Sequence, residues 1–398
     1  MQLDRRAFLG GAGVLGLSAA LEPLARAAPA LPFPELRAAG THGAIGLQHG
    51  RTFQQAIKHN AAFYLAWLGR ATGAKSSDLL QLARAFTPVL EREVPELYEE
   101  IEGIARGSRR SPEEILLINA RTDLLVVAGR LRPPRQPKPA PGCTALVMVG
   151  KGRGDKPLLA LGQNWDWRPE LKQHTVVLRL QPSKGPRIVT FTEAGMVGKI
   201  GFNEHRLGVC LNFLAHKSDS PHGELGVPVH CLLRACMGCA TLERAYKLVA
   251  WASRCASANF MLAQHAPGTS PAALDLEITP TAVARIPLRD GFLVHTNHFK
   301  DTALSPGCTS GRGRSTMNRN EVAEKLARRL GPQMLDPSRQ MTRVLASREG
   351  APYSVSKTSA PDSPSMTLAG IVMDLSRNRL LLTAGGPHQH RWVVRPGV

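Results

Sequence analysis

Cys143 is the residue whose surroundings point most directly to chemistry. Residues 132–142 before it contain five prolines, so this stretch forms neither a helix nor a central strand. Residues 143–149 after it are an apolar run of strand length. A cut between Gly142 and Cys143 would leave a cysteine as a new N-terminus, with a thiol and an α-amine on one residue. That pair is a nucleophile with its own base.

A free α-amine suits this task because its pKa is about 7.7–8.0 without any special environment. It can take the proton of a thiol whose pKa is about 8.5, and the thiolate can then attack an acyl carbonyl. Before the cut the same nitrogen is an amide and is not basic, so the precursor is expected to lack turnover. Gly142 has no side chain and can adopt the geometry that Cys143 needs to attack the Gly142 carbonyl.

Two further residues are candidates for the same site. Asn297 ends a predicted strand, and its neutral side-chain amide can donate a hydrogen bond to the oxyanion of a tetrahedral intermediate. Asp166 lies between two tryptophans at a strand end, where a carboxylate is costly unless paired, so we expect it to orient the amine. On spacing alone, Asn297 could also be a turn or capping residue, and Asp166 a structural turn residue.

Other catalytic arrangements have less support. His295 lies 152 residues after Cys143, a distance compatible with a papain-like pair, but the signature around a papain-type cysteine is absent. His295 and His298 could bind a metal, yet no third ligand cluster accompanies them. The G-x-S-x-G motif of many serine hydrolases does not occur. We therefore expect neither a metal nor another cofactor.

The N-terminus carries the features of a twin-arginine export signal. Arg5 and Arg6 precede a weakly apolar, Gly- and Ala-rich run at residues 7–21, and residues 25–27 offer small residues for cleavage. The run is too short to span a membrane, which needs about 20 apolar residues. We expect residues 1–27 to engage the twin-arginine export machinery, which makes the protein periplasmic or secreted. The alternatives are an uncleaved signal that tethers the protein to the membrane, and a chance Arg-Arg pair before a core helix.

Composition limits the other classes of function. The formal net charge of +19 attracts anions, but the basic residues are scattered and only 5% of residues are aromatic, so nucleic-acid binding is not expected. Three of the seven cysteines, Cys231, Cys236 and Cys239, fall in an apolar helical pattern without a second ligand pair for zinc. We expect them to be buried, structural thiols.

The elements change in character at Cys143. Residues 46–130 show helical periodicity with a break at Pro95, and a capping box at Ser111 and Glu114 begins a helix expected to run to about Val127. After the Pro-rich loop, strands are expected at 143–149, 158–167, 175–181, 187–193, 197–203, 207–214, 258–264, 273–279, 282–286, 292–298, 367–375, 378–384 and 390–395. Helices are expected at 227–237, 241–252, 316–330 and 337–347. This order fits one α+β domain, a four-layer αββα sandwich of two facing sheets covered by helices.

Several motifs together resemble one known family. They are Gly142-Cys-Thr144, Gly162-Gln-Asn-Trp-Asp166, Thr192-Glu-Ala-Gly195, Gly198-Lys-Ile-Gly-Phe-Asn203 and His295-Thr-Asn-His298, with propeptide-like segments at 98–105 and 119–122. The chain is similar, from about residue 42 onwards, to the acyl-coenzyme A:6-aminopenicillanic-acid acyltransferases, peptidase-C45-like N-terminal nucleophile hydrolases. The resemblance implies the αββα fold and self-cleavage before Cys143. It also implies two chains that stay together, a helical propeptide or α chain (28–142) and a catalytic β chain (143–398).

The resemblance implies roles for single residues as well. Cys143 matches the nucleophile of the family, Asp166 its acid and Asn297 its oxyanion donor. Near the C-terminus this chain has a lysine where the fungal penicillin enzyme has an arginine, and lysine lacks the bidentate fork, so recognition of a substrate carboxylate is expected to differ. The candidate substrate-binding residues are Ser354, Lys357 and Trp165.

The sequence thus predicts an exported, self-processing cysteine amidohydrolase that cleaves a small N-acyl amine or amino-acid amide. An exported protein has little access to acyl-coenzyme A, so water is the expected acceptor. One alternative is an acyltransferase that acts on a β-lactam or a peptide amine. The other is a non-catalytic relative that uses its basic surface for binding.

Overall fold

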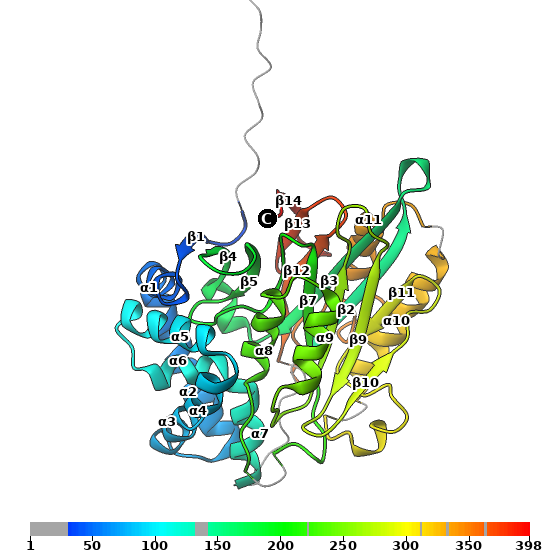
Figure 1. The fold of residues 1–398 in the computed structure, drawn as a ribbon. Coiled ribbons are helices and arrows are strands. Elements are labelled where there is room, and N and C mark those ends of the chain that lie inside the picture. The colour runs from blue at the N-terminus through cyan, green and yellow to red at the C-terminus, as the bar shows by residue number, and fades with distance from the viewer. Residues whose placement is uncertain (1–30, 132–141, 221–222, 311–312, 332–333, 362–363) are drawn as a thin grey trace, which may run out of the picture. The chain divides into compact units, whose positions relative to one another are not determined.

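The structure is a computed structural model that describes residues 31–131, 142–220, 223–310, 313–331, 334–361 and 364–398 (Figure 1). The predicted export signal at residues 1–27 and the prolines of the loop before Cys143 lie outside the described residues. Within the described part, none of the helices combines the length and the apolar character needed to cross a membrane.

Residues 42–131 form the helical part that the sequence predicts. Its helices are α1 (His42–Thr52), α2 (Gln54–Thr72), α3 (Ser76–Arg84), α4 (Thr87–Glu93), α5 (Pro95–Ser108), α6 (Pro112–Asn119) and α7 (Arg121–Leu131). The capping box is confirmed. Ser111 Oγ accepts from the Glu114 amide at 3.3 Å, and the Glu114 carboxylate accepts from the Ser111 amide at 2.9 Å.

The helix after this capping box is shorter than the sequence predicts. It ends at Asn119, and α7 starts at Arg121 after a break at Ala120. The Asn119 side chain donates to the Gly195 carbonyl at 2.9 Å and accepts from the Val197 amide at 3.0 Å. These partners are 76 and 78 residues away, so no local pattern could have predicted the break.

The larger sheet has eight strands in the order β1-β4-β5-β6-β7-β8-β9-β10. Its strands are β1 (Glu35–Gly40), β4 (Thr175–Pro182), β5 (Ile188–Glu193), β6 (Ile200–Asn203), β7 (Leu207–Phe213), β8 (Ala258–Gln264), β9 (Ala272–Ile278) and β10 (Val283–Ile286). All but β1 were expected from the sequence. β1 lies at the edge and pairs in parallel with β4, and its short, mixed sequence has no strict alternation.

The smaller sheet is antiparallel, with six strands in the order β11-β2-β3-β12-β13-β14. Its strands are β2 (Gly142–Lys151), β3 (Pro157–Trp167), β11 (Phe292–His295), β12 (Met366–Asp374), β13 (Arg379–Ala384) and β14 (Val393–Pro396). The expected hairpin of the last long strands is confirmed as β12–β13. The final strand begins three residues later than expected.

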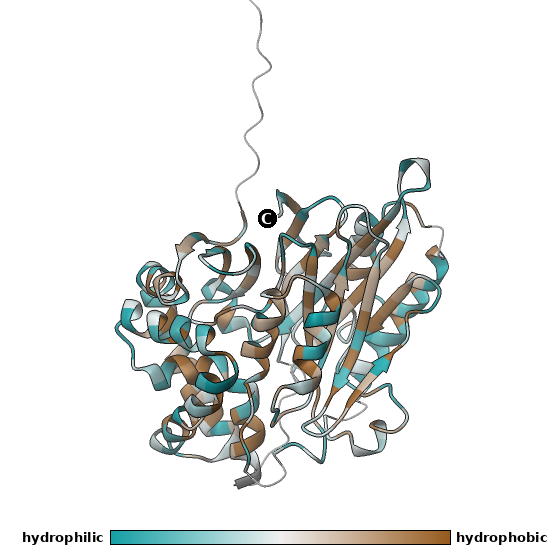
Figure 2. Cartoon of the chain, in the orientation of Figure 1, coloured by the Kyte–Doolittle hydropathy of each residue, from teal (hydrophilic) through white to brown (hydrophobic). Residues whose placement is uncertain are grey.

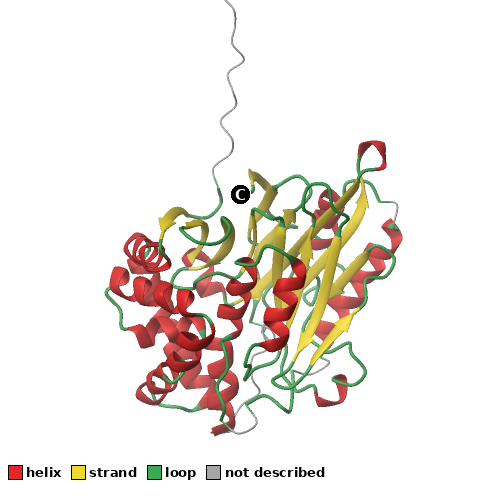
Figure 3. Cartoon of the chain, viewed as in Figure 1, coloured by secondary structure: helices red, strands yellow, loops and turns green. Residues whose placement is uncertain are grey.

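The two sheets pack face to face, with β2 and β3 against β7 and β8. Helices α8 (Val229–Met237) and α9 (Leu242–Trp251) contact β7 and β8, whereas α10 (Arg314–Leu330) and α11 (Pro337–Leu345) contact the smaller sheet from its other side. Figure 3 shows the helices outside the strands, and Figure 2 shows hydrophobic residues gathered in those strands. The predicted αββα sandwich is confirmed.

Side chains of β2 alternate between two cores. Ala145 and Val147 belong to the main core with residues of the facing sheet, while Leu146 and Met148 belong to a second core with α10 and α11. Successive side chains of a strand point to opposite faces. Cys143 therefore faces the space between the sheets, and Thr144 faces α10.

Candidate active site

Cys143 is the second residue of β2, at the edge of the described chain after the Pro-rich loop. In the pairing of β2 with β3, Cys143 is opposite Trp165 and Gly142 is opposite Asp166. Residues opposite each other lie on the same face of the sheet. Cys143 and Trp165 are thus neighbours between the sheets, and the Asp166 side chain lies against the backbone of Gly142. Cys143 is only 5% exposed.

A small pocket of about 40 Å³ lies at Cys143. Its apolar wall comes from β3, from the facing β7 and β8, and from the start of α8. Arg121 and Thr122 of α7 also line it, so residues on both sides of the predicted cut build one pocket. The full set of lining residues is Arg121, Thr122, Cys143, Trp165, Trp167, Lys199, Leu211, Phe213, Val229, His230 and Ala258.

The structure brings Asn297 to Cys143. Asn297 follows β11, and its Oδ1 accepts from the Cys143 amide at 2.9 Å and from Arg319 Nη2 at 2.8 Å. These two donors orient the amide, because an oxygen and not a nitrogen must receive them. Asn297 Nδ2 points the other way and donates to the carbonyl of Phe213 at 3.0 Å, a residue of the pocket wall.

Asp166 is fully buried beside Gly142. Its Oδ1 accepts from Thr367 Oγ1 at 2.6 Å, whereas Oδ2 has no hydrogen-bond partner among the described residues. A Cβ atom on residue 142 would lie 2.9 Å from this oxygen, so only glycine fits there without a shift. Burial raises the pKa of Asp166, and the nearby cations Arg319 and Lys357 oppose that rise.

Sequence reasoning missed Arg319, a buried residue of α10. Its Nη1 donates to the Cys143 carbonyl and, at 3.0 Å, to Thr144 Oγ1, while Nη2 binds Asn297. One guanidinium thus joins the backbone of Cys143 to the candidate oxyanion donor, a use that suits its rigid fork of donors. In the sequence it is one of several basic residues along an amphipathic helix, so no signal distinguished it.

In this uncut chain the Cys143 thiol is a weak acid. Burial raises its pKa to about 11, and the Asp166 carboxylate adds to the rise, although Lys199 and Arg319 lower it. The thiol is therefore protonated near neutral pH. A base is needed to make it a nucleophile.

The other candidate residues lie elsewhere. Ser354 and Lys357 are buried: Ser354 Oγ donates to the Ser356 carbonyl at 2.7 Å, and Lys357 Nζ donates to Ser365 Oγ at 2.7 Å. Neither lines the pocket at Cys143, whereas Trp165 does. The Lys357 amide donates to Thr367, which holds Asp166, so this segment lies behind the carboxylate. The substrate-binding role of Ser354 and Lys357 stays a prediction.

Across the described residues, the structure does not support a catalytic pair of Cys143 with His295, or a metal site. His295 Nε2 lies 2.7 Å from Glu277 Oε1 and Nδ1 lies 3.0 Å from the Thr296 carbonyl, so both ring nitrogens are engaged away from Cys143. Over the described ranges, no group of three or more potential ligands is placed to hold a metal. The predicted structural cysteines Cys231 and Cys236 are buried in α8, and Cys239 is buried just after it.

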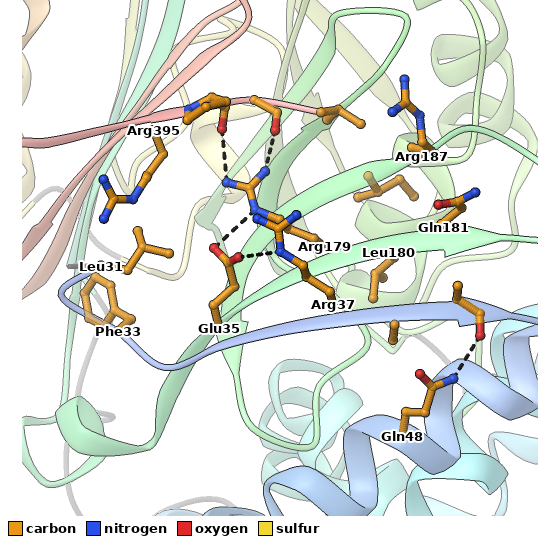
Figure 4. Close-up of a pocket in the computed structure, with 16 residues that line it drawn as sticks. Leu31, Phe33, Glu35, Arg37, Gln48, Arg179, Leu180, Gln181, Arg187 and Arg395 are labelled. Carbon is orange, nitrogen blue, oxygen red and sulfur yellow. Dashed lines mark hydrogen bonds and ion pairs between the residues drawn. The ribbon is translucent and has the colours of Figure 1, made fainter. Parts of the chain in front are cut away.

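A much larger groove, of about 930 Å³, lies away from Cys143 along β1 and β4 (Figure 4). Arg37 and Arg179 both pair there with Glu35, at 3.2 and 3.1 Å. Arg179 also donates to the Pro396 carbonyl at 3.0 Å. Arg187 pairs with Glu204 at 2.9 Å. The groove holds none of the predicted site residues.

A four-layer αββα sandwich with a cysteine at the start of a buried central strand is the architecture of N-terminal nucleophile enzymes. Residues 152–389 match the family described as acyl-coenzyme A:6-aminopenicillanic acid acyl-transferase. The chain is also 30% identical, over 292 residues, to the 40 kDa form of acyl-coenzyme A:6-aminopenicillanic-acid acyltransferase from Emericella nidulans, covering 73% of each protein. This chain therefore belongs to the acyl-coenzyme A:6-aminopenicillanic acid acyl-transferase family.

Solved structures give more distant matches. A Caenorhabditis elegans ortholog of N-acylethanolamine-hydrolyzing acid amidase is 16% identical, with a TM-score of 0.42, covering 59% of this chain and 93% of its own. Penicillin V acylase from Agrobacterium tumefaciens is also 16% identical, with a TM-score of 0.40 and coverages of 61% and 83%. Family membership makes the chain an enzyme related to the acyltransferases. The alternative of a non-catalytic binding protein is thereby set aside.

Proposed function

We propose that this enzyme cuts its own chain between Gly142 and Cys143 and then uses Cys143 as an N-terminal nucleophile to hydrolyse the amide bond of a small N-acyl amine or amino acid. The observation that carries the proposal is the hydrogen bond from the Cys143 nitrogen to Asn297 Oδ1 at 2.9 Å. A nitrogen held in this way keeps its place when it changes from amide to amine.

The surroundings of Gly142 support the cut at this position. Asp166 Oδ2 lies against Gly142 without a partner among the described residues. When the bond to Gly142 is broken, the new ammonium group of Cys143 would have two acceptors within reach, Asp166 Oδ2 and Asn297 Oδ1. Such an arrangement would offset the burial of the carboxylate and hold the amine beside the thiol.

Self-cleavage would proceed by transfer of the acyl group from nitrogen to sulfur. The Cys143 sulfur adds to the Gly142 carbonyl carbon, the carbon–nitrogen bond breaks, and the nitrogen takes the proton that the thiol loses. Water then hydrolyses the thioester, which frees the Gly142 carboxylate and the Cys143 thiol. Once the export signal has been removed in a separate cut, the products are chains 28–142 and 143–398, which would share the pocket at Cys143.

Turnover would repeat these steps on a substrate. The amine of Cys143 takes the thiol proton, and the thiolate adds to the substrate carbonyl to give a tetrahedral oxyanion. Asn297 Nδ2 gives one N–H to the Phe213 carbonyl, so its second N–H is the proposed oxyanion donor, and one such donor is typically worth about 2.7–4 kcal/mol in the transition state. The ammonium protonates the leaving amine, and water hydrolyses the acyl-enzyme.

Fragment analysis tests the cut directly. We expect purified wild-type protein to give two fragments by intact mass, and N-terminal sequencing of the larger one to begin at Cys143. A fully active enzyme with an unbroken chain, or a large fragment that begins elsewhere, would contradict the proposal. Residues 1–27 should be absent from the small fragment of exported protein, because we propose export through the twin-arginine route to the periplasm or the medium.

Acyl transfer is the second candidate, because the 30% identical relative is named an acyltransferase. Both activities pass through the same acyl-enzyme and differ in whether water or an amine attacks it. Adding a β-lactam amine or a peptide amine to the assay measures the partition. Hydrolysis product in excess over transfer product supports the amidohydrolase, and the reverse supports the transferase.

A further inference from the structure

A buried charge cluster at the pocket is not used by the mechanism above. Arg121 Nη2 and Lys199 Nζ both ion-pair with Glu193, at 2.8 and 3.6 Å. Two cations therefore share one carboxylate. The side chains are only 6%, 3% and 0% exposed, respectively, so water does not screen them.

Glu193 makes closer contacts with two other residues than with Lys199. Its Oε1 accepts from the hydroxyl of Tyr64, and its Oε2 is closest to Arg121. Burial raises the pKa of Tyr64 and lowers that of His230 well below its usual value, so both are neutral and add no charge. The cluster holds a positive surplus whenever Lys199 is protonated.

An aromatic ring compensates Lys199 only in part. Lys199 Nζ lies 3.4 Å from the centre of the Trp165 ring, a cation–π contact on the face that also carries Cys143. A cation–π contact offsets only part of the free-energy cost of burying a cation. In agreement, burial lowers the pKa of Lys199 to about 7 despite Glu193. A second anion would neutralise the remaining positive charge of the cluster.

We propose that Lys199 and Arg121 form a carboxylate-binding subsite beside Cys143, so that the substrate is an amide with a carboxylate near the scissile bond, such as an N-acyl amino acid. This inference rests on the proposed function and narrows its substrate class. The pocket at Cys143 measures about 40 Å³, so a small anionic group such as a carboxylate can enter it. Trp167, Leu211 and Phe213 form apolar walls, so we expect the two cations to select a carboxylate over a neutral group there.

The first test measures the preference of the pocket for an anion and needs no substrate. Iodoacetate and iodoacetamide both alkylate the Cys143 sulfur with loss of iodide, but only iodoacetate is an anion. We expect the ratio of their rates at Cys143, followed by peptide mass, to exceed that of free cysteine by about tenfold or more in wild-type enzyme. Lys199→Met should lower the ratio toward that of free cysteine. Lys199→Arg should keep it.

The control variant is Lys247→Met, the same change on α9 at an exposed side chain, which should leave the ratio unchanged. Equal ratios in wild-type enzyme and free cysteine would overturn the subsite, and this result needs no variant to fold. A fall of both rates by the same factor in Lys199→Met would also overturn it, because Lys199 would then serve the thiolate and not an incoming anion.

The second test uses a matched pair of substrates, an N-acylglycine and its N-acylglycinamide. We expect kcat/KM of wild-type enzyme to favour the carboxylate by about tenfold or more, mainly through KM, and Lys199→Met to remove that preference. Equal loss on both substrates would overturn the subsite. If the enzyme does not hydrolyse such amides, neither substrate is turned over, while the alkylation ratio still reports on the cations. Failure of the proposed function is therefore distinguishable from failure of the subsite.

Discussion

Two regions of this molecule contain the same charge motif, a glutamate shared by two cations. In the large groove Glu35 pairs with Arg37 and Arg179, and in the pocket at Cys143 Glu193 pairs with Arg121 and Lys199. In the groove the Arg37 side chain is 79% exposed, so solvent screens its charge, whereas the second cluster is buried. An exposed surplus of charge has little consequence, but a buried one is costly without an anion.

Cavity volume alone would favour the groove as the active site. The groove is more than twenty times larger than the pocket at Cys143, with about 930 against about 40 Å³, yet no thiol or hydroxyl of the described residues lines it, and three of its arginines, Arg37, Arg179 and Arg187, are paired with carboxylates. The small pocket combines a thiol with two cations that share one carboxylate, and the Asn297 amide lies next to it at the Cys143 nitrogen. The difference teaches that the charge balance and burial of a cavity, more than its volume, mark a reactive site.

The comparison predicts, first, that Cys143 is indispensable. Cys143→Ala removes the sulfur that attacks both Gly142 and the substrate, so the chain should run uncut, and turnover should fall by roughly 10⁴-fold or more. Intact mass and an amidase assay measure the two effects. Self-cleavage in this variant would show that another residue is the nucleophile.

Asn297→Ala should have the next largest effect. Loss of one oxyanion donor lowers kcat by about 10²–10³-fold, and KM should change little because the oxyanion forms only in the transition state. Asn378→Ala is the matched change beside the groove, where Asn378 holds Val398. Its kcat should stay within about twofold of wild type. Equal effects of the two variants on kcat would contradict a specific role of Asn297 in catalysis.

Gly142→Ala tests the close approach of Asp166. The added Cβ would lie 2.9 Å from Asp166 Oδ2 and 3.0 Å from its Cβ. Overpacking of about 1–3 kcal/mol should slow self-cleavage by about 10–100-fold in a time course of fragment formation. Gly313→Ala, at a glycine with open space around it, is the control and should cleave at the wild-type rate.

A pH profile sharpens the electrostatic side of the comparison. Burial lowers the pKa of Lys199 to about 7, so its charge is present below pH 7 and is lost as the pH rises above it. The kcat/KM ratio of an N-acylglycine to its amide should therefore fall from pH 6 to pH 8, by roughly tenfold. Titration of the Cys143 amine affects both substrates and cancels in the ratio. A ratio that is flat between pH 6 and pH 8 would contradict the loss of charge on Lys199 in this range.

The smallest effect is expected in the groove. Arg187 pairs with Glu204 at 2.9 Å, and their side chains are 52% and 32% exposed. Arg187→Met should lower the free energy of unfolding by about 1 kcal/mol or less and should leave turnover unchanged. Urea unfolding and the amidase assay measure the two quantities. A strong loss of turnover would assign the groove a function in catalysis.

Local patterns predicted most of the fold. The run at residues 143–149 proved to be part of β2, the hairpin of β12 and β13 was expected, and the capping box at Ser111 begins α6. Each depends on residues a few positions apart. Edge strand β1 and the break at Ala120 were missed, because a parallel partner and the bonds of Asn119 lie far along the chain.

The site was predictable only in part. Cys143 and Asn297, 154 residues apart in sequence, meet as the motifs suggested. Arg319 reaches the Cys143 carbonyl from 176 residues away and has no distinguishing neighbours in sequence. Lys199 is part of a family motif, but its proposed role depends on its burial and on its ion pair with Glu193, which the sequence does not show. A charge has the same letter in the sequence whether water or protein surrounds it.

By itself, the sequence predicted the bond between Gly142 and Cys143 as the site of the cut, since a proline-rich loop, a glycine and a cysteine before an apolar strand are local features. It also determined the alternation that sends Cys143 and Thr144 to opposite faces. Only the tertiary structure decided which cations lie beside the sulfur and which carboxylates balance them. The physical reason is that desolvation and Coulomb interactions depend on distances in space, which packing of α7, β3 and α10 sets.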